Sequence, residues 1–153
     1  MTIQKLDFLQ KQIRELDKAI RSAVWATHSP LLSIPGISPT LAAMILTEIG
    51  DIHRFSSPDK LQAFVGLEPS TYQCDLFKSA LTPMVKRGST YLRWELFQAA
   101  RLVSINCGTF HDYLLSKQAQ GKHYYVALSH TTKKLIRVIF SILNAIEVFV
   151  HQA

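Results

Sequence analysis

Apolar residues recur at alternating spacings of three and four through the first 26 positions. This spacing places them along one side of an α-helix and is the seam of a two-stranded coiled coil. The seam consists of Leu6, Leu9, Ile13, Leu16, Ile20 and Ala23. The pattern predicts a helix over residues 1–26, ended by His28-Ser29-Pro30, through which the chain forms a homodimer or a higher oligomer. The alternative is an amphipathic helix that lies on the core of its own chain.

Residues 31–50 predict a tight turn followed by a helix. Pro35-Gly36 is a turn sequence in which glycine supplies a positive φ. Ser38 is an N-cap followed by proline, and Gly50 ends a helix whose apolar stripe is expected at Leu41, Met44, Ile45 and Ile49. The segment therefore has the pattern of a helix-hairpin-helix.

Backbone N–H groups of such a hairpin, and of the helix that follows it, can hold a phosphate. On this basis Pro35, Gly36 and Ile37 are assigned to DNA binding. However, the segment is acidic, because it carries Glu48 and Asp51 with Asp59 shortly after. A purely structural hairpin is therefore the alternative.

The rest of the chain predicts more helices and one long loop. Ser57-Pro58 opens a short helix that ends at Gly66, and Ser89 caps a longer one that ends at Gly108. Two further helices are expected over residues 110–120 and 123–150, with Gly121 between them. Residues 67–88 lack helical periodicity, and a loop of roughly twenty residues is too long to be idle in a compact domain. The expected fold is all-α, with residues 29–153 as one helical domain.

Positive charge is concentrated in the C-terminal half. The formal net charge is +6, and residues 78–153 hold ten Lys or Arg against three Asp or Glu. This distribution favours a nucleic-acid partner, the alternative being a solvated basic face. The candidate DNA-binding side chains are Lys86, Arg87, Arg93, Lys133, Lys134 and Arg137. For Arg93 and Arg137 an ion pair within the protein is the alternative.

Metal and membrane chemistry have little support in the sequence. His111 follows Cys107 by four residues, but a helix break at Gly108 is expected between them, so no metal site is predicted. The apolar stretch 135–150 is interrupted by Arg137, Asn144 and Glu147 and predicts a buried helix rather than a membrane span. With a polar N-terminus, the chain is expected in the cytoplasm with no membrane partner. From spacing alone Cys74 is a lone thiol.

Several blocks of the sequence resemble a known family. They read IPGISPTLAAMILTEIGDIHRFSSPDKLQAFVGLEPSTYQ, KRGSTYLRWELFQAARL, GKHYYVAL and KKLIRVIFSIL. In this order, over roughly residues 31–148, they are similar to the C-terminal transposase domain of the insertion-sequence recombinases that are guided by a bridge RNA. The N-terminal heptad resembles the coiled coil that precedes this domain and helps it to dimerise.

The resemblance implies a catalytic role for the long loop. Members of the family join a resolvase-like domain, which carries four acidic metal ligands, to a helical domain that contributes a serine nucleophile. That serine attacks a DNA phosphate and forms a covalent intermediate. The family's loop reads like GLAPSxYQSG, and the match places Cys74 at the serine and Asp75 at the glycine. The acidic domain, with the Mg²⁺ that the resemblance implies for it, is not expected in this chain, which itself needs no cofactor.

The function expected from these observations is that of the DNA-binding and strand-transfer domain of an insertion-sequence transposase. Its partners would be DNA and a guide RNA, at the nucleoid of a bacterial or archaeal cell. The alternative is a non-catalytic module that binds DNA and dimerises, because the nucleophilic serine is replaced by Cys74 and the acidic domain is missing.

Overall fold

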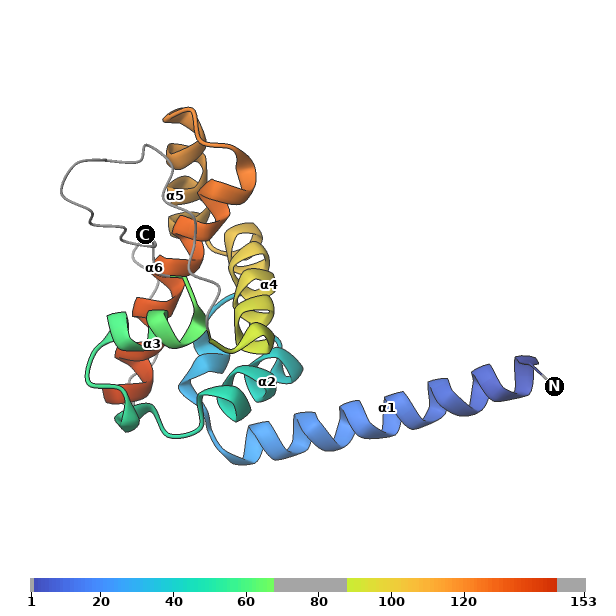
Figure 1. The fold of residues 1–153 in the computed structure, drawn as a ribbon. Helices are drawn as coiled ribbons and strands as arrows, with labels where there is room; N and C mark the ends of the chain where they lie inside the picture. Colours follow the sequence, from blue (N-terminus) through green and yellow to red (C-terminus); the bar gives the residue numbers. More distant parts are fainter. Residues whose placement is uncertain (1, 68–87, 146–153) are drawn as a thin grey trace.

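The computed structural model describes residues 2–67 and 88–145, and this part of the chain is helical with no β-strand, as predicted (Figure 1). The predicted loop segment 68–87 lies outside the described residues, and so does the predicted end of the last helix beyond residue 145. The elements in chain order are α1 (Thr2–Ala26), η1 (Pro30–Ser33), α2 (Pro39–Ile49), η2 (Ile52–Arg54), α3 (Pro58–Val65), α4 (Thr90–Asn106), α5 (Gly108–Ala119) and α6 (Tyr124–Ala145).

Serine caps begin three of the helices, as the sequence predicts. Ser38 accepts a hydrogen bond from the N–H of Leu41 at 3.2 Å at the start of α2. At the start of α3, Ser57 accepts a hydrogen bond from the N–H of Lys60. At the start of α4, Ser89 accepts one from the N–H of Leu92 at 3.1 Å. Each cap satisfies one of the N–H groups that a helix leaves without an internal partner.

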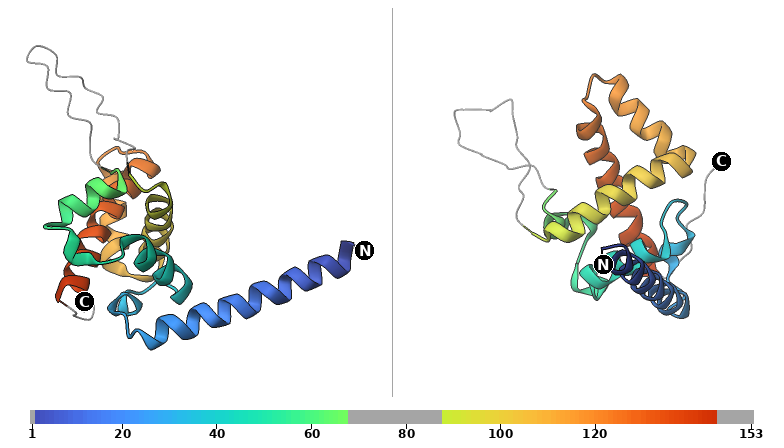
Figure 2. Two further views of the ribbon diagram at one scale, coloured as in Figure 1. Left: turned by 60° about the horizontal axis from the view of Figure 1, so that its bottom comes forward. Right: turned by 90° about the vertical axis from the view of Figure 1, so that its right-hand side faces the viewer.

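Helix α6 is the centre of the core and packs against α3, α4 and α5 (Figures 1 and 2). Its residues Leu135, Ile136 and Ile139 are completely buried. The inner side of α4 is formed by Leu92, Leu96, Ala99 and Val103, which are all buried. In α2, by contrast, Met44 is 38% exposed, so the stripe that packs inward consists of Leu41, Ile45 and Ile49.

The seam of α1 is exposed to solvent, and its helix projects from the body as an arm (Figures 1 and 2). Leu9, Ile13 and Leu16 are 54%, 64% and 63% exposed, and Val24 is the one buried residue described in this helix. The last turns are attached to α2, where Thr40 donates a 2.7 Å hydrogen bond to Asp17. The alternative interpretation, a helix that lies on the core of its own chain, is therefore wrong, because most seam residues belong to the part of α1 that projects from the body.

The segment before the hairpin turn is not an α-helix. Residues 30–33 form a single 3₁₀ turn, because only a few residues separate His28, which has a positive φ of 47°, from Pro35. The turn itself is as predicted: Gly36 has φ of 100°, and the N–H of Ile37 donates to the carbonyl of Ile34 at 3.1 Å. This is the bond that closes a β-turn with glycine at its third position.

Two boundaries differ from the prediction. Helix α4 ends at Asn106 and α5 begins at Gly108, two residues earlier than expected. The buried Cys107 forms the junction, because its extended φ of −131° lets one helix stop and the next start at once. Gly121, with φ of 79°, separates α5 from α6 as predicted. Among the described helices, none combines the length and the apolar character that a membrane crossing needs.

Candidate nucleic-acid interface

The two ends of the predicted functional loop meet at one point. The predicted nucleophile Cys74 and the predicted DNA contacts Lys86 and Arg87 lie outside the described residues. The residues on either side are described, however, and the N–H of Ser89 donates to the carbonyl of Phe64 at 3.0 Å. Gly88 has φ of 129°, and a Cβ there would overlap the carbonyl oxygen of Phe64. The end of α3 and the residues just before α4 are thus in direct contact.

Arg93 strengthens this junction. Its guanidinium donates to the carbonyl of Val65 at 3.1 Å and to the hydroxyl of Thr90 at 3.4 Å. Its contacts with the described residues are therefore hydrogen bonds that tie α4 to the end of α3, and the ion pair that was the alternative is not found among those residues. The DNA contact predicted for Arg93 stays a prediction, made by a side chain that is half-buried in the structure.

Two carboxylates lie beneath the junction. Ser89 donates a 2.6 Å hydrogen bond to Glu48, and Glu95 on α4 is 5% exposed. Burial raises the pKa of Glu95, and the nearby charge of Glu48 raises it further. One carboxylate oxygen of Glu95 has no hydrogen-bond partner among the described residues. The sequence analysis missed this pair because Glu48 and Glu95 belong to different helices.

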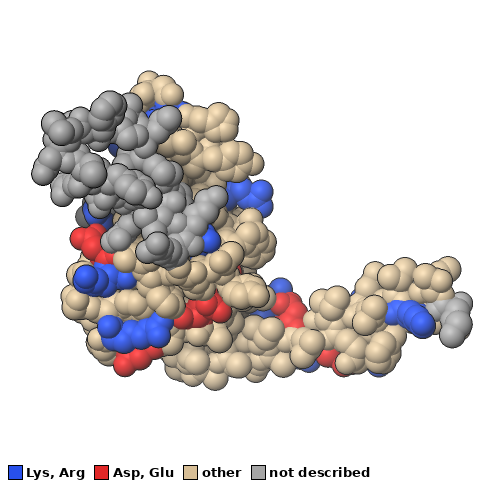
Figure 3. Space-filling view, in the orientation of Figure 1, with Lys and Arg blue, Asp and Glu red and all other residues tan. Residues whose placement is uncertain are grey.

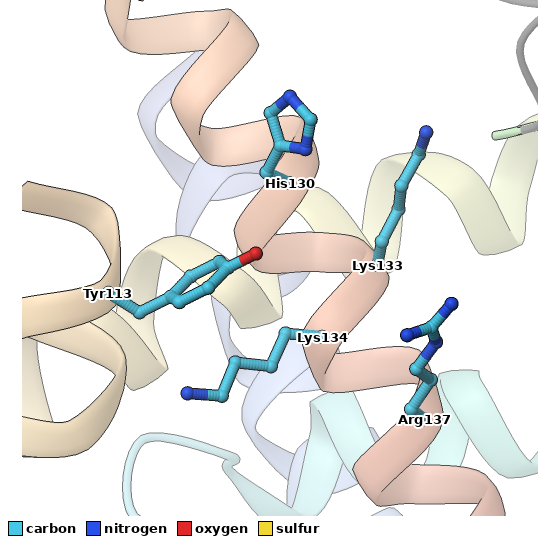
Figure 4. A pocket seen from close by; sticks show the side chains of 5 residues that line it. All are labelled: Tyr113, His130, Lys133, Lys134 and Arg137. Carbon is cyan, nitrogen blue, oxygen red and sulfur yellow. The ribbon is translucent and has the colours of Figure 1, made fainter. Parts of the chain in front are cut away.

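The predicted basic cluster of α6 is brought together in one pocket. Lys133, Lys134 and Arg137 line a surface pocket of about 330 Å³ with His130 of the same helix and Tyr113 of α5 (Figure 4). Tyr113 points from α5 toward α6, and Lys134 extends back toward α5 below its ring. The sequence analysis missed Tyr113 and His130, although the short connection between α5 and α6 was a signal that the two helices are neighbours.

The side chains of this pocket are held by specific contacts. The ammonium of Lys134 lies 4.5 Å from the ring centroid of Tyr113 and 5.4 Å from that of Phe110, distances typical of cation–π contacts. Arg137 forms a 3.6 Å ion pair with Asp59 of α3, which was the alternative interpretation of Arg137. Both partners remain about two-thirds exposed, so the pair contributes little stability.

The electrostatic potential of the pocket is positive. Burial lowers the pKa of His130, and the charges of Lys122, Lys133 and Lys117 lower it further. His130 is therefore a neutral hydrogen-bonding group among cations. Figure 3 shows that Lys and Arg are spread over the body in that view, whereas most of the visible face of the arm is uncharged.

Two of the three hairpin residues predicted to bind DNA, Gly36 and Ile37, are packed against the rest of the protein. A Cβ on Gly36 would lie 2.7 Å from the backbone carbon and oxygen of Leu102 in α4, and Ile37 is 6% exposed. Pro35 is partly exposed. Contacts between these three residues and DNA stay predictions, while the structural role of the hairpin, which was the alternative, is what the contacts show.

Comparison with known proteins assigns this chain to a family. The family model described as Transposase IS116/IS110/IS902 family matches residues 28–115, which is more than half of the chain. The match begins next to the 3₁₀ turn and runs through α2, α3, the loop segment and α4 into α5.

Individual relatives agree with this match. The chain is 29% identical over 152 residues to a transposase for insertion sequence element IS1328 of Yersinia enterocolitica, covering 95% of this chain and 45% of the relative. It is 31% identical over 110 residues to a probable family 20 transposase of Pseudomonas aeruginosa, covering 71% and 32%. It is 38% identical over 69 residues to a transposase for insertion sequence element IS1111A of Coxiella burnetii, covering 45% and 19%. The chain thus spans less than half the length of these relatives.

Proposed function

The chain belongs to the IS116/IS110/IS902 family of transposases, and from this premise we propose that it is the part of an insertion-sequence transposase that binds DNA and transfers strands. The family match supports a role in transposition. The observation that carries the finer proposal is the junction of Phe64 and Ser89, where the loop that includes Cys74 begins and ends. A loop fixed at its base to rigid helices is a common place for catalytic residues.

In this proposal Cys74 acts on a phosphodiester of DNA. The thiol loses its proton to solvent, and the thiolate forms a bond from Sγ to phosphorus. The bond between phosphorus and one flanking sugar oxygen breaks, and that oxygen takes a proton from solvent. The strand end is then held as a thiophosphate ester, and attack by the sugar hydroxyl of a second strand releases the thiol and forms the new phosphodiester.

The basic residues hold the strand during this reaction. Lys133, Lys134 and Arg137 present positive charge on α6, and the N-terminus of α4 follows the loop directly, with its dipole favouring a phosphate there. Lys86 and Arg87 precede that helix in the sequence. Guide RNA is a further proposed partner. With DNA as its partner, the protein would act in the cytoplasm, at the nucleoid.

A covalent adduct tests the catalytic part of the proposal. The chain is incubated with element-end DNA, guide RNA and the acidic domain of a relative, and denaturant-stable protein–DNA adducts are measured by mass spectrometry. We expect an adduct that Cys74→Ala abolishes, whereas Cys107→Ala leaves it intact because Cys107 is buried in the core. Cys74→Ser tests whether the loop accepts the family's nucleophile.

A second candidate function has its own support. The exposed seam of α1 is what a module that dimerises and binds DNA without catalysis would require. If neither Cys74 nor a serine in its place forms an adduct while element-end DNA still binds, this non-catalytic function replaces the first proposal.

A further inference from the structure

We propose that the pocket between α5 and α6 binds one unpaired nucleotide of a nucleic-acid strand, with Tyr113 and His130 as residues that select unpaired over duplex DNA. This inference rests on the proposed function, because it takes DNA as the ligand. It goes further by assigning the pocket to a single-stranded segment and by adding two uncharged hydrogen-bonding groups to the predicted cations.

The shape of the pocket favours one nucleotide. Its volume of about 330 Å³ is at the lower end of the range for small-molecule sites, which is roughly 300–1,000 Å³. A duplex presents its phosphates on the outside of a stiff cylinder and is usually contacted by side chains along an open surface. A concave site of this size suits a nucleotide that has left the base stack, as happens in single strands and in flipped bases.

The chemistry of the lining also favours an unpaired nucleotide. Lys133 and Arg137 project side by side from successive turns of α6 (Figure 4) and supply charge for a phosphate. The phenol of Tyr113 and the imidazole of His130 can each donate and accept a hydrogen bond. These groups match the base edges that are accessible in a single strand, whereas a contact to backbone phosphates alone needs only cations.

The arrangement is preorganised before any ligand arrives. The ring of Tyr113 lies 4.5 Å from the ammonium of Lys134 and 5.1 Å from that of Lys117. Because burial, and then the charges of Lys122, Lys133 and Lys117, lower the pKa of His130, the pocket combines fixed positive charge with neutral donors. Asp59 of α3 is an acidic group bound at this site, through its 3.6 Å ion pair with Arg137. A phosphate would therefore compete with Asp59 for that guanidinium.

Tyr113→Phe is the decisive variant, because it removes the hydroxyl and keeps the ring that holds Lys134. Binding of the full chain is measured by fluorescence anisotropy with a single-stranded oligonucleotide and with the duplex of the same sequence. We expect the variant to weaken single-strand binding by about three- to tenfold, which corresponds to one lost hydrogen bond, and to change duplex binding less than about twofold. His130→Ala should show the same selectivity, and Tyr125→Phe, which is exposed at the start of α6 and does not line the pocket, is the matched control.

The possible outcomes separate this inference from the proposed function. If Tyr113→Phe and His130→Ala weaken binding to both ligands equally, or to neither, while the wild-type chain binds duplex DNA, the single-strand pocket is wrong and the DNA-binding function stands. If the wild-type chain binds neither ligand, the pocket and the DNA-binding function are both wrong. Circular dichroism of each variant at the assay temperature establishes that a loss of binding is not a loss of folding.

Discussion

Ser89 donates its hydroxyl proton to Glu48 at 2.6 Å and accepts the N–H of Leu92 at 3.1 Å with the same oxygen. One side chain thus caps α4 and ties it to the end of α2. Since the backbone N–H of Ser89 also donates to the carbonyl of Phe64, three helices are joined at Ser89. The residue proposed as the nucleophile, Cys74, lies between Phe64 and Ser89 in the sequence.

Substituting Ser89 should therefore cost more stability than substituting an ordinary cap. We expect Ser38→Ala, which removes a cap hydrogen bond alone, to lower the free energy of unfolding by about 1 kcal/mol. Ser89→Ala should lower it by about 2 kcal/mol, because Glu48 also loses its donor. Urea denaturation of the two variants measures the difference, and equal losses would show that the contact with Glu48 contributes nothing.

The packing of the hairpin predicts that alanine destabilises the protein at Gly36 but not at Gly108. Gly36→Ala should lower the free energy of unfolding by at least about 2 kcal/mol, because φ is 100° and the added Cβ would lie 2.7 Å from the backbone of Leu102. Gly108→Ala is the control: nothing lies within 4 Å of its Cβ position, so we expect no loss and a gain of up to about 0.5 kcal/mol. Thermal unfolding of both variants tests this, and a harmless Gly36→Ala would contradict the packing of the hairpin on α4.

Glu95 predicts a pH dependence of stability. Burial and the charge of Glu48 raise its folded-state pKa above the ordinary value of 4.5, so the folded chain binds the proton more tightly than the unfolded chain. The contribution of the Glu95 carboxyl to the free energy of unfolding therefore falls as pH rises from about 4.5 through the folded-state pKa. Glu95→Gln should remove this decrease in the free energy of unfolding.

Urea denaturation between about pH 4 and pH 8 measures this effect. We expect the difference in unfolding free energy between Glu95→Gln and the wild type to shift in favour of the variant as pH rises. Glu15→Gln, on the exposed arm, should keep the wild-type pH dependence. Parallel curves for Glu95→Gln and the wild type would show that the carboxyl titrates as it does in the unfolded chain.

The basic side chains predict a salt dependence of duplex binding. The six predicted phosphate contacts are Lys86, Arg87, Arg93, Lys133, Lys134 and Arg137. If all six neutralise phosphates, the slope of log affinity against log salt should be near about −5, and replacing both Lys133 and Lys134 by Ala should reduce its magnitude by about 2. Lys11→Ala with Lys18→Ala is the control on the arm. A slope near zero for the wild type would exclude DNA as the partner.

The arm predicts a homodimer. Isoleucine alternates with leucine along much of the seam, with Ile13 and Ile20 at one heptad position and Leu9 and Leu16 at the other, a combination that favours two parallel strands. We expect a dimer by analytical ultracentrifugation, and Ile13→Asp should raise its dissociation constant by more than about tenfold because a charge would enter the buried seam. Lys18→Asp, off the seam, is the control. A wild-type chain that stays monomeric would leave the exposed seam without this explanation.

Local sequence signals predicted much of the helical framework. Ser38, Ser57 and Ser89 mark helix starts because a serine oxygen can satisfy an N–H one turn ahead, and this interaction needs only neighbouring residues. The same holds for the turn at Gly36 and for the break at Gly121, where the backbone requires a positive φ. The 3₁₀ turn before the hairpin was not predicted, because a four-residue segment is decided by the constraints at its ends more than by its own pattern.

The sequence by itself thus determined where α2 and α3 begin and end and where α4 begins, because capping and turn formation act over a few residues. It also placed Lys133, Lys134 and Arg137 on one helix, since that follows from their spacing. Only the tertiary structure decided that Tyr113 of α5 completes their pocket, that Glu48 reaches Ser89, and that the seam of α1 stays outside the core. These relationships join residues far apart in the chain, and they depend on how whole helices pack rather than on any local pattern.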